Sequence, residues 1–299
     1  VYLKPDLPPG TVEMRDRFAI KTTRHRDFPN LVLFKYDQIA SPFAERVVQE
    51  SRGIVLDEAD GWRCVSRAFD KFFNHGEGHA ASIDWSTARV QEKVDGSLCT
   101  VYRYQDAWRV ATSGMPDASG DVNGMGFTFA DLFWRTLRAT GPLPFASESD
   151  LCFVFELTSP WNRVVVRHAA ESLTLLAVRD RATGSELAPE LFADRYPVVR
   201  SFPLASLVDT LATFESMDPL RQEGYVVVDG AFRRVKVKHP GYVAIHHMRD
   251  GFGPRRVLEV IRSGESPELL AHFPEWGPEF VRVRGAYDAL CAEVEADFD

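Results

Sequence analysis

Residues 223–238, EGYVVVDGAFRRVKVK, contain two runs of strand-forming residues on either side of Asp229-Gly230. Valine favours β-strands, and Asp-Gly is a strong signal for a two-residue turn between antiparallel strands. The stretch therefore predicts a β-hairpin. Counting back along both strands from a two-residue turn places Glu223 directly opposite Lys236. A three-residue loop would shift the register and break this pairing.

The two lysines of this hairpin are expected to share one face of the sheet. Because side chains alternate along a strand, Lys236 and Lys238 should project from one side, and Val235 and Val237 from the other. Two ammonium groups with the Glu223 carboxylate would suit a phosphate chain with its metal ion. The alternative without a function is an exposed ion pair between Glu223 and Lys236 on neighbouring strands.

Most of the preceding chain has the same pattern of short β-branched or aromatic runs ended by turn residues. This pattern indicates antiparallel hairpins and an α+β fold. Residues 53–59 and 62–67 should pair around Asp60-Gly61, and a helix is expected from about Phe127 to Arg138, starting near Asn123. Further strands are expected at 97–104, 107–112, 151–156, 163–166 and 173–178.

The spacing of apolar residues changes near residues 251–254. RRVLEVIRS, SPELLAHF and PEFVRVRGAYDALCAEVEADF carry apolar residues three and four positions apart, a spacing that predicts helices. We therefore expect one large sheet domain, residues 1–245, and a small helical domain, residues 246–299. The boundary should lie between about residues 240 and 252.

The charge of the chain argues against a protein that coats nucleic acid. The 299 residues include 26% charged residues and have a formal net charge of −8, whereas such a coat is normally basic. Any contact with nucleic acid should therefore be local. The stretch from Arg221 to Arg256 is basic against this average, and it is either a solvated face or a contact surface.

The sequence indicates no membrane segment, export signal or metal–thiolate site. No apolar run approaches the roughly 20 residues that span a bilayer, and VYLKPDLPPG lacks the basic and apolar pattern of a signal peptide. A reducing cytoplasm is the expected location. The cysteines are far apart and form no CxxC pair: Cys64, Cys99, Cys152 and Cys291.

The segment Glu92-Lys93-Val94-Asp95-Gly96-Ser97 contains a Lys-x-Asp-Gly motif. Alone, this motif is weak, because it also occurs in surface turns with a solvated lysine. Further segments accompany it in order: SRGI at 51–54, RAFDKFFN at 67–74, FVFE at 153–156, EGYVV at 223–227 and RVKVK at 234–238.

With these segments the chain resembles the covalent nucleotidyltransferases, which are the polynucleotide ligases and the mRNA capping enzymes. Within them it is most similar to the ATP-dependent RNA ligases of the phage tRNA-repair type. That closer resemblance covers roughly residues 30–247 and rests on RGI at 52–54, KFFN at 71–74, ELTSPWNRV at 156–164 and YVAIH at 242–246.

The resemblance implies a fold and a reaction. Residues 1–245 would form an adenylyltransferase domain of antiparallel sheets with flanking helices, and residues 246–299 an all-helical domain. The enzyme would join RNA 3′-hydroxyl and 5′-phosphate ends through a lysyl-AMP and an AMP-RNA intermediate, in RNA repair. End-healing enzymes or a partner subunit would be its protein partners.

The resemblance also assigns the nucleophile. Lys93 would attack ATP and carry AMP, and a free lysine has a pKa of about 10.4. Positive charge from Lys236, Lys238 and a divalent metal would lower the pKa of Lys93 and neutralise the reacting phosphates. The catalytic residues implied are Lys93, Asp95, Glu223, Lys236 and Lys238.

A wider set would bind the nucleotide and its metal. Arg52 and Lys71 would hold phosphates, Phe73 would stack on adenine, and Glu156 would bind the ribose or a metal-bound water. Glu223 and Glu156 would hold the metal, Mg²⁺ or alternatively Mn²⁺. The nucleotide-binding set implied is Arg52, Lys71, Phe73, Glu92, Lys93, Glu156, Glu223, Lys236 and Lys238.

One segment departs from the family pattern. The family commonly has Ser-Lys-Gly after the hairpin of the nucleophile, whereas this chain has Thr112-Ser113-Gly114. The missing lysine bears on the RNA-dependent steps that follow adenylation, and not on adenylation itself. The alternatives are a DNA ligase or capping-type enzyme, in which a β-rich domain usually follows the paired lysines, and a non-catalytic or partner-dependent RNA-binding subunit.

Overall fold

The computed structural model describes residues 12–248, 253–262, 266–267, 270 and 274–298. Within them the strands form three antiparallel sheets. The first sheet, β1-β2-β3-β4, comprises Ile20–Arg24, Leu31–Tyr36, Arg52–Asp57 and Arg63–Ser66. The second, β10-β9-β8-β6-β7, comprises Glu186–Leu187, Ser172–Asp180, Leu151–Thr158, Ser97–Tyr104 and Ala107–Thr112. The third, β11-β5-β12-β13, comprises Ser201–Phe202, Arg89–Glu92, Gly224–Val228 and Arg234–Lys238.

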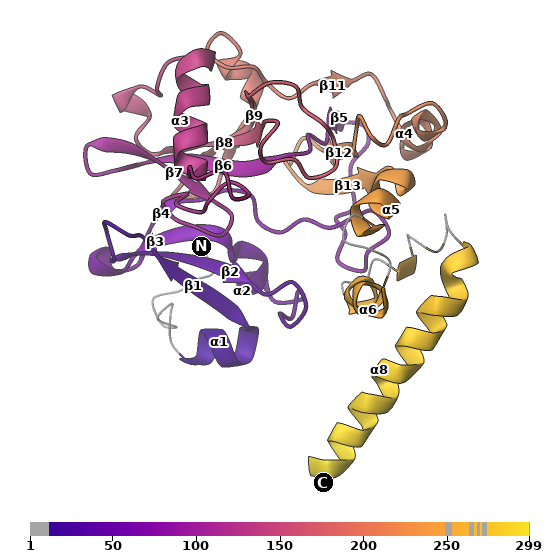
Figure 1. Ribbon diagram of the computed structural model, residues 1–299. Helices are drawn as coiled ribbons and strands as arrows, with labels where there is room; N and C mark the ends of the chain where they lie inside the picture. Colours follow the sequence, from indigo (N-terminus) through magenta and orange to yellow (C-terminus); the bar gives the residue numbers. More distant parts are fainter. Residues whose placement is uncertain (1–11, 249–252, 263–265, 268–269, 271–273, 299) are drawn as a thin grey trace.

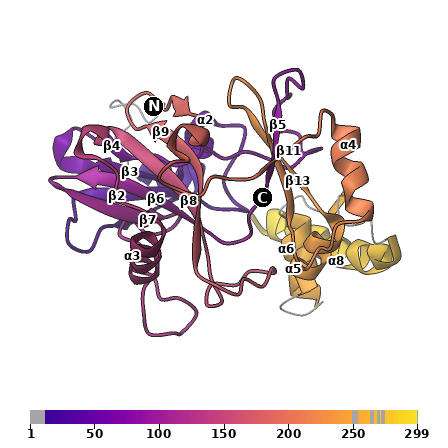
Figure 2. The same ribbon diagram turned by 90° about the horizontal axis from the view of Figure 1, so that it is seen from above.

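Helices flank these sheets, which confirms the predicted α+β class. Seen from above in Figure 2, the first two sheets lie together on one side, and the third lies on the other side with α4 and α5. The α-helices are α1 Val12–Phe18, α2 Arg46–Glu50, α3 Phe129–Thr140, α4 Leu207–Ala212, α5 Pro240–Met248, α6 Pro254–Arg262 and α8 Gly277–Phe298. Short 3₁₀ turns occur at Glu58–Asp60, Ala146–Glu148, Pro189–Phe192, Thr213–Glu215 and Pro274–Trp276.

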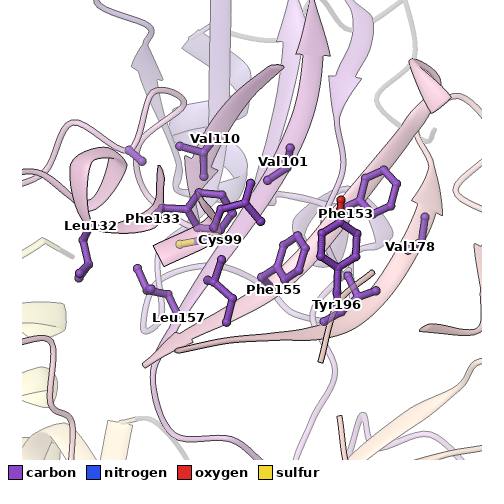
Figure 3. Packing of buried hydrophobic residues seen from close by; sticks show 14 of the residues in the cluster. Cys99, Val101, Val110, Leu132, Phe133, Phe153, Phe155, Leu157, Val178 and Tyr196 are labelled. Atoms are coloured by element: carbon purple, nitrogen blue, oxygen red, sulfur yellow. The ribbon is translucent and has the colours of Figure 1, made fainter. Parts of the chain in front are cut away.

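Two apolar clusters hold the first two sheets and α3 together. Phe133 of α3 packs among Cys99, Phe155 and other residues of the second sheet (Figure 3). A separate cluster joins Leu33 of the first sheet to Tyr102 of the second. Each large aromatic side chain buried here contributes roughly 2–3 kcal/mol through removal of apolar area from water. The two sheets therefore form one rigid support for the strands that carry functional residues.

Most strand predictions are confirmed, with one exception. The structure has strands at 97–104, 107–112, 151–158 and 172–180, and the hairpin at 52–66 forms. The predicted strand at 163–166 is wrong, because the amides of Val165 and Val166 donate to the Asp95 carboxylate at 2.9 and 2.7 Å instead of to another strand. Side-chain acceptors of this kind compete with a β-ladder for backbone donors.

The predicted central helix is confirmed, but its starting point is wrong. Asn123 lies in a loop with a φ of 50°. The helix starts after Thr128, whose hydroxyl accepts a hydrogen bond from the Asp131 amide while the Asp131 carboxylate accepts one from the Thr128 amide. This reciprocal capping satisfies amides that lack partners within the helix. The helix ends at Thr140, before Gly141, as predicted.

The hairpin predicted at 223–238 forms, but in a different register. Val226 pairs with Lys236, so the predicted pairing of Glu223 with Lys236 is wrong. The Glu223 carbonyl instead accepts a hydrogen bond from the His239 amide at 2.8 Å.

The shift in register has a local cause in the loop. The Asp229 carboxylate accepts hydrogen bonds from the amides of Ala231 and Arg233, each at 3.0 Å. These bonds stabilise a loop over residues 229–233 in place of the two-residue turn. Val235 and Val237 are buried in the third sheet's apolar cluster.

The C-terminal part is helical in the residues described, as predicted. Val243 of α5, Val257 of α6 and Phe280 of α8 share an apolar cluster, and Figure 1 shows α8 extending away from the sheets. Helix α5 crosses residues 245 and 246, and the division into domains there stays a prediction. No helix among the described residues is long and apolar enough to cross a membrane.

Candidate active site

A cleft of about 570 Å³ is lined by residues of all three sheets. Its walls include β3, β5, β6, β8 and β13, so segments far apart in the sequence meet there. Glu223 contacts two of its residues without lining it. The predicted site residues that line the cleft are Arg52, Glu92, Lys93, Glu156, Lys236 and Lys238.

The predicted nucleophile is in direct contact with a buried acid. The Lys93 Nζ donates to Glu223 Oε2 at 2.6 Å, and Lys238 Nζ lies 3.9 Å from Glu223 Oε1. The side chain of Glu223 is 5% exposed and that of Lys93 is 21% exposed. Breaking such an ion pair by removing one partner leaves a buried charge uncompensated.

Glycine explains how Glu223 reaches this position. Regular alternation would place Glu223 with Tyr225, on the buried face opposite to the lysines. Gly224 has a φ of +135°, which L residues rarely adopt, and a Cβ on it would lie 2.4 Å from the Val237 carbonyl oxygen. The break in alternation at Gly224 lets the Glu223 carboxylate lie on the lysine side of the strand.

Lys236 and Arg52 are cations of the cleft that have no carboxylate partner among the described residues. Lys236 Nζ lies 5.1 Å from the centre of the Phe72 ring, and the Arg52 guanidinium lies 5.0 Å from the same ring. Burial lowers the pKa of Lys236 well below its usual value, and the positive charges of Arg52, Lys238 and Lys93 act in the same direction. An anion bound here would compensate these charges.

Glu156 is a carboxyl group of the cleft that has no ion-pair partner among the described residues. It lies on β8 and lines the cleft. Burial raises the pKa of Glu156 to about 8, while the charge of Lys93 acts to lower it and that of Glu223 to raise it. A buried carboxyl group with a raised pKa tends either to keep its proton or to bind a cation.

The residues predicted to hold a metal fit that role chemically. The described residues contain no preformed group of three or more metal-ligating side chains. Glu223 lies close enough to Glu156 for its charge to raise the pKa of Glu156, and Mg²⁺ commonly uses one or two carboxylates together with substrate phosphates and water. The two carboxylates therefore suit a metal that arrives with a nucleotide.

Asp95 lies behind the nucleophile and connects three segments of the chain. Its carboxylate accepts hydrogen bonds from the Tyr242 hydroxyl at 2.7 Å and from the amides of Val165 and Val166. Its carbonyl oxygen lies 2.8 Å from His168 Nε2. Asp95 is 5% exposed, so it orients the loop that carries Lys93 rather than lining the cleft.

Two predicted nucleotide-binding residues lie outside the cleft. Lys71 and Phe73 line a second, neighbouring hollow of about 390 Å³. The Lys71 ammonium lies 4.1 Å from the centre of the Phe43 ring and 5.4 Å from that of Phe73, and Phe73 is 6% exposed. Their nucleotide-binding roles stay predictions.

Sequence reasoning missed several residues of the cleft, among them Lys35 and Phe72. Phe72 is adjacent to the predicted Phe73, and alternation along the segment would have separated the two. Lys35 pairs directly with Arg52 across β2 and β3, which no local sequence signal indicates.

The basic stretch from Arg221 to Arg256 does not form one charged face. Arg233 pairs with Asp229, Arg234 with Glu186 and Arg256 with Glu259. Arg249 and Asp250 lie outside the described residues. Apart from Lys236 and Lys238, this stretch thus supplies mostly local ion pairs.

Comparison with known proteins identifies the family. A family model described as RNA ligase matches residues 50–242, which is more than half of the chain. The chain belongs to the RNA ligase family. The sequence-based prediction of an ATP-dependent RNA ligase is thereby confirmed at the level of the family.

Individual relatives agree with this assignment. The chain is 27% identical over 335 residues to an RNA ligase of Rhodothermus phage RM378, covering 90% of this chain and 76% of that protein. A relative from Autographa californica nuclear polyhedrosis virus is 26% identical to this chain. The match covers 89% of this chain but only 40% of the length of that relative. An archaeal ATP-dependent RNA ligase has a similar fold, with a TM-score of 0.56, 17% identity and coverage of 91% of this chain and 74% of that one. The ligase thus has the nucleotidyltransferase fold predicted.

Proposed function

We propose that this ligase transfers AMP from ATP to Lys93 and then uses it to join an RNA 3′-hydroxyl to a 5′-phosphate. The observation that carries the proposal is the contact of Lys93 with Glu223 beside a cleft whose walls include Arg52 and Lys236, which have no carboxylate partner among the described residues. A lysine that only stabilised the fold would not need further cations beside it, because like charges in one cleft repel.

In the first step the amine of Lys93 attacks the α-phosphate of ATP. A nitrogen–phosphorus bond forms, the bond to the β-phosphate oxygen breaks, and pyrophosphate leaves. The amine must be neutral to attack, and Glu223, at 2.6 Å, is the acceptor in contact with it. Lys236 and Lys238 offset the negative charge that develops on the phosphates.

A divalent metal fits the same site. Mg²⁺, or Mn²⁺ in its place, would neutralise phosphate charge when bound and would be held by Glu156 and Glu223. Glu156 also lies where it could accept a hydrogen bond from the ribose. Arg52 would bind the phosphates that leave, since its guanidinium faces the cleft without a carboxylate partner among the described residues.

The later steps use the same cleft. The 5′-phosphate of the RNA attacks the phosphorus of the lysyl-AMP, which frees Lys93 and gives AMP-RNA. A 3′-hydroxyl then attacks the 5′-phosphate, and AMP leaves as the phosphodiester forms. We propose RNA repair as the setting and the cytoplasm as the location.

The test of this function is the joining of defined RNA ends. The ligase is mixed with 5′-phosphorylated, 3′-hydroxyl RNA, either single-stranded or nicked in a duplex, with Mg²⁺ and ATP. We expect an ATP-dependent joined product that is absent with 5′-hydroxyl RNA or with GTP. Joining of DNA in preference to RNA would favour the DNA ligase alternative. Transfer of AMP to Lys93, called charging below, without joining would favour a partner-dependent subunit.

A further inference from the structure

Lys35 of β2 lies directly opposite Arg52 of β3 in the first sheet, and both residues line the cleft. The register of the two strands shifts between Phe34 and Lys35, so the lysine sits at an irregular point of the ladder. Like charges opposite each other on a sheet are destabilising. A pair of this kind is explained by an anion that binds to both.

Neither side chain of this pair has a carboxylate partner among the described residues. Arg52 reaches a backbone carbonyl, that of Asp70, at 3.5 Å. Burial lowers the pKa of Lys35, and the positive charges of Arg52 and Lys21 act in the same direction. By contrast, Lys21 on the neighbouring strand is 74% exposed and pairs with Asp37 at 2.7 Å.

A tight turn forms the other wall beside Lys35. Gly53 has a φ of +87°, and a Cβ on it would lie 3.0 Å from the Cα of Ser113, so glycine lets the turn lie against β3. The Thr112 hydroxyl accepts a hydrogen bond from the Met115 amide at 3.1 Å, which stabilises the turn. A Cβ on Gly114 would lie 3.5 Å from Lys35 Nζ. Lys35 and the turn therefore lie side by side in the wall of the cleft.

Lys35 belongs to the first sheet, whereas Lys93 directly follows β5 of the third sheet. The cations that influence the titration of Lys236 include Lys93 and Lys238, whereas those that influence Lys35 are Arg52 and Lys21. Arg52 pairs with Lys35 across β2 and β3 and lies beside the same Phe72 ring as Lys236, so it connects the two groups of cations. Lys236 and Lys238 account for the single phosphate of an AMP joined to Lys93, which leaves Lys35 for a phosphate of another molecule.

We propose that Lys35 and the Thr112–Gly114 turn bind a backbone or terminal phosphate of the RNA strand whose end enters the cleft. The proposal rests on the proposed function of the same cleft. Lys35 acts by binding the RNA, so it matters for transfer of AMP to RNA and for sealing, and not for the charging of Lys93 by ATP.

The experiment compares Lys35→Met and Lys35→Arg with the wild-type ligase, and uses Lys21→Met as the matched surface control. Charging of Lys93 is followed with α-labelled ATP, and sealing is followed separately with a pre-adenylylated RNA oligonucleotide. We expect Lys35→Met to charge at the wild-type rate within about twofold and to seal roughly tenfold more slowly, as for the loss of one charge-assisted hydrogen bond. Lys35→Arg and Lys21→Met should seal normally.

Salt dependence separates a phosphate contact from a structural effect. For single-stranded RNA, loss of one phosphate contact should lower the slope of log affinity against log salt concentration by about 0.7. A second variant, Lys35→Met with Ser113→Lys, returns an ammonium to the same turn and should recover sealing. An unchanged salt slope, or a double variant no better than Lys35→Met, contradicts the proposal.

The outcomes distinguish this proposal from the function on which it rests. Equal loss of charging and sealing in Lys35→Met would assign Lys35 to the phosphates of ATP and overturn the proposal. Normal sealing by Lys35→Met would also overturn it, while leaving the ligase function intact. A wild-type protein that neither charges nor seals would overturn the function itself.

Discussion

Lys93 donates a 2.6 Å hydrogen bond to the carboxylate of Glu223, a residue 130 positions further along the chain. The resemblance to the family implies a role in the reaction for both residues but does not predict that they are in contact. The contact gives Glu223 a defined task, because it holds the amine in place and is the acceptor nearest to its proton. It also means that any metal held by Glu223 competes with Lys93 and Lys238 for the same carboxylate.

Glu223→Gln should slow the charging of Lys93 by at least about tenfold, since an amide neither accepts the proton nor holds a metal as well as a carboxylate does. The measurement is the rate at which label from α-labelled ATP appears on the protein. Glu215→Gln, which removes an exposed carboxylate outside the cleft, is the control. Equal rates for the two variants would show that Glu223 has no role in charging.

Tyr242→Phe should affect both stability and charging, because it removes the 2.7 Å hydrogen bond to the buried Asp95 carboxylate. We expect a loss of about 1–3 kcal/mol in the free energy of unfolding, measured with urea. Tyr196→Phe removes a comparable hydrogen bond, to the Pro142 carbonyl in the core, and should lower stability without slowing charging in the folded protein. Slower charging in both variants would contradict a positioning role for Tyr242.

Glu156→Gln should change how stability depends on pH. The pKa of Glu156 is raised from 4.5 to about 8 in the folded ligase, so folding favours the protonated form. Stability from this group is present below about pH 4.5 and is lost as the pH rises through about 8. Because glutamine does not ionise, the variant should gain stability relative to the wild type between about pH 5 and pH 9, measured by urea unfolding. A constant difference across this range would contradict the burial of Glu156.

Phe72→Leu and Phe73→Leu should have different effects. Arg52 and Lys236 lie 5.0 and 5.1 Å from the centre of the Phe72 ring, so loss of this ring should weaken ATP binding by about fivefold, as expected for two cation–π contacts. Phe73 is buried outside the cleft, and its replacement should lower stability with little effect on ATP affinity. Calorimetric titration with ATP measures both. A larger loss of affinity in Phe73→Leu would instead support stacking of Phe73 on adenine.

The features that were predictable from sequence are those set by local patterns. Alternation predicts that Lys236 and Lys238 share one face of their strand in any register, and in the structure that face lines the cleft. The register itself was not predictable, since it depends on how the Asp229 carboxylate binds the amides of its own loop. A two-residue turn and a five-residue loop can both begin with Asp229-Gly230, so these two residues do not distinguish them.

Features that depend on tertiary contacts escaped sequence reasoning. Residues 163–166 have strand-forming side chains, yet Asp95 takes the amides that a strand would need. Lys35 enters the cleft because β2 pairs with β3, which is a relationship between strands and not a motif. It brings an ammonium to the turn where Ser113 stands in place of the family's lysine.

The most direct measurement is the mass of the ligase after incubation with ATP and Mg²⁺, followed by peptide mapping. The account predicts the added mass of one AMP, located on Lys93, and no addition with GTP or in Lys93→Ala. An unmodified wild-type chain under Mg²⁺ and Mn²⁺, or AMP located on another residue, would contradict the central claim that Lys93 carries the nucleotide.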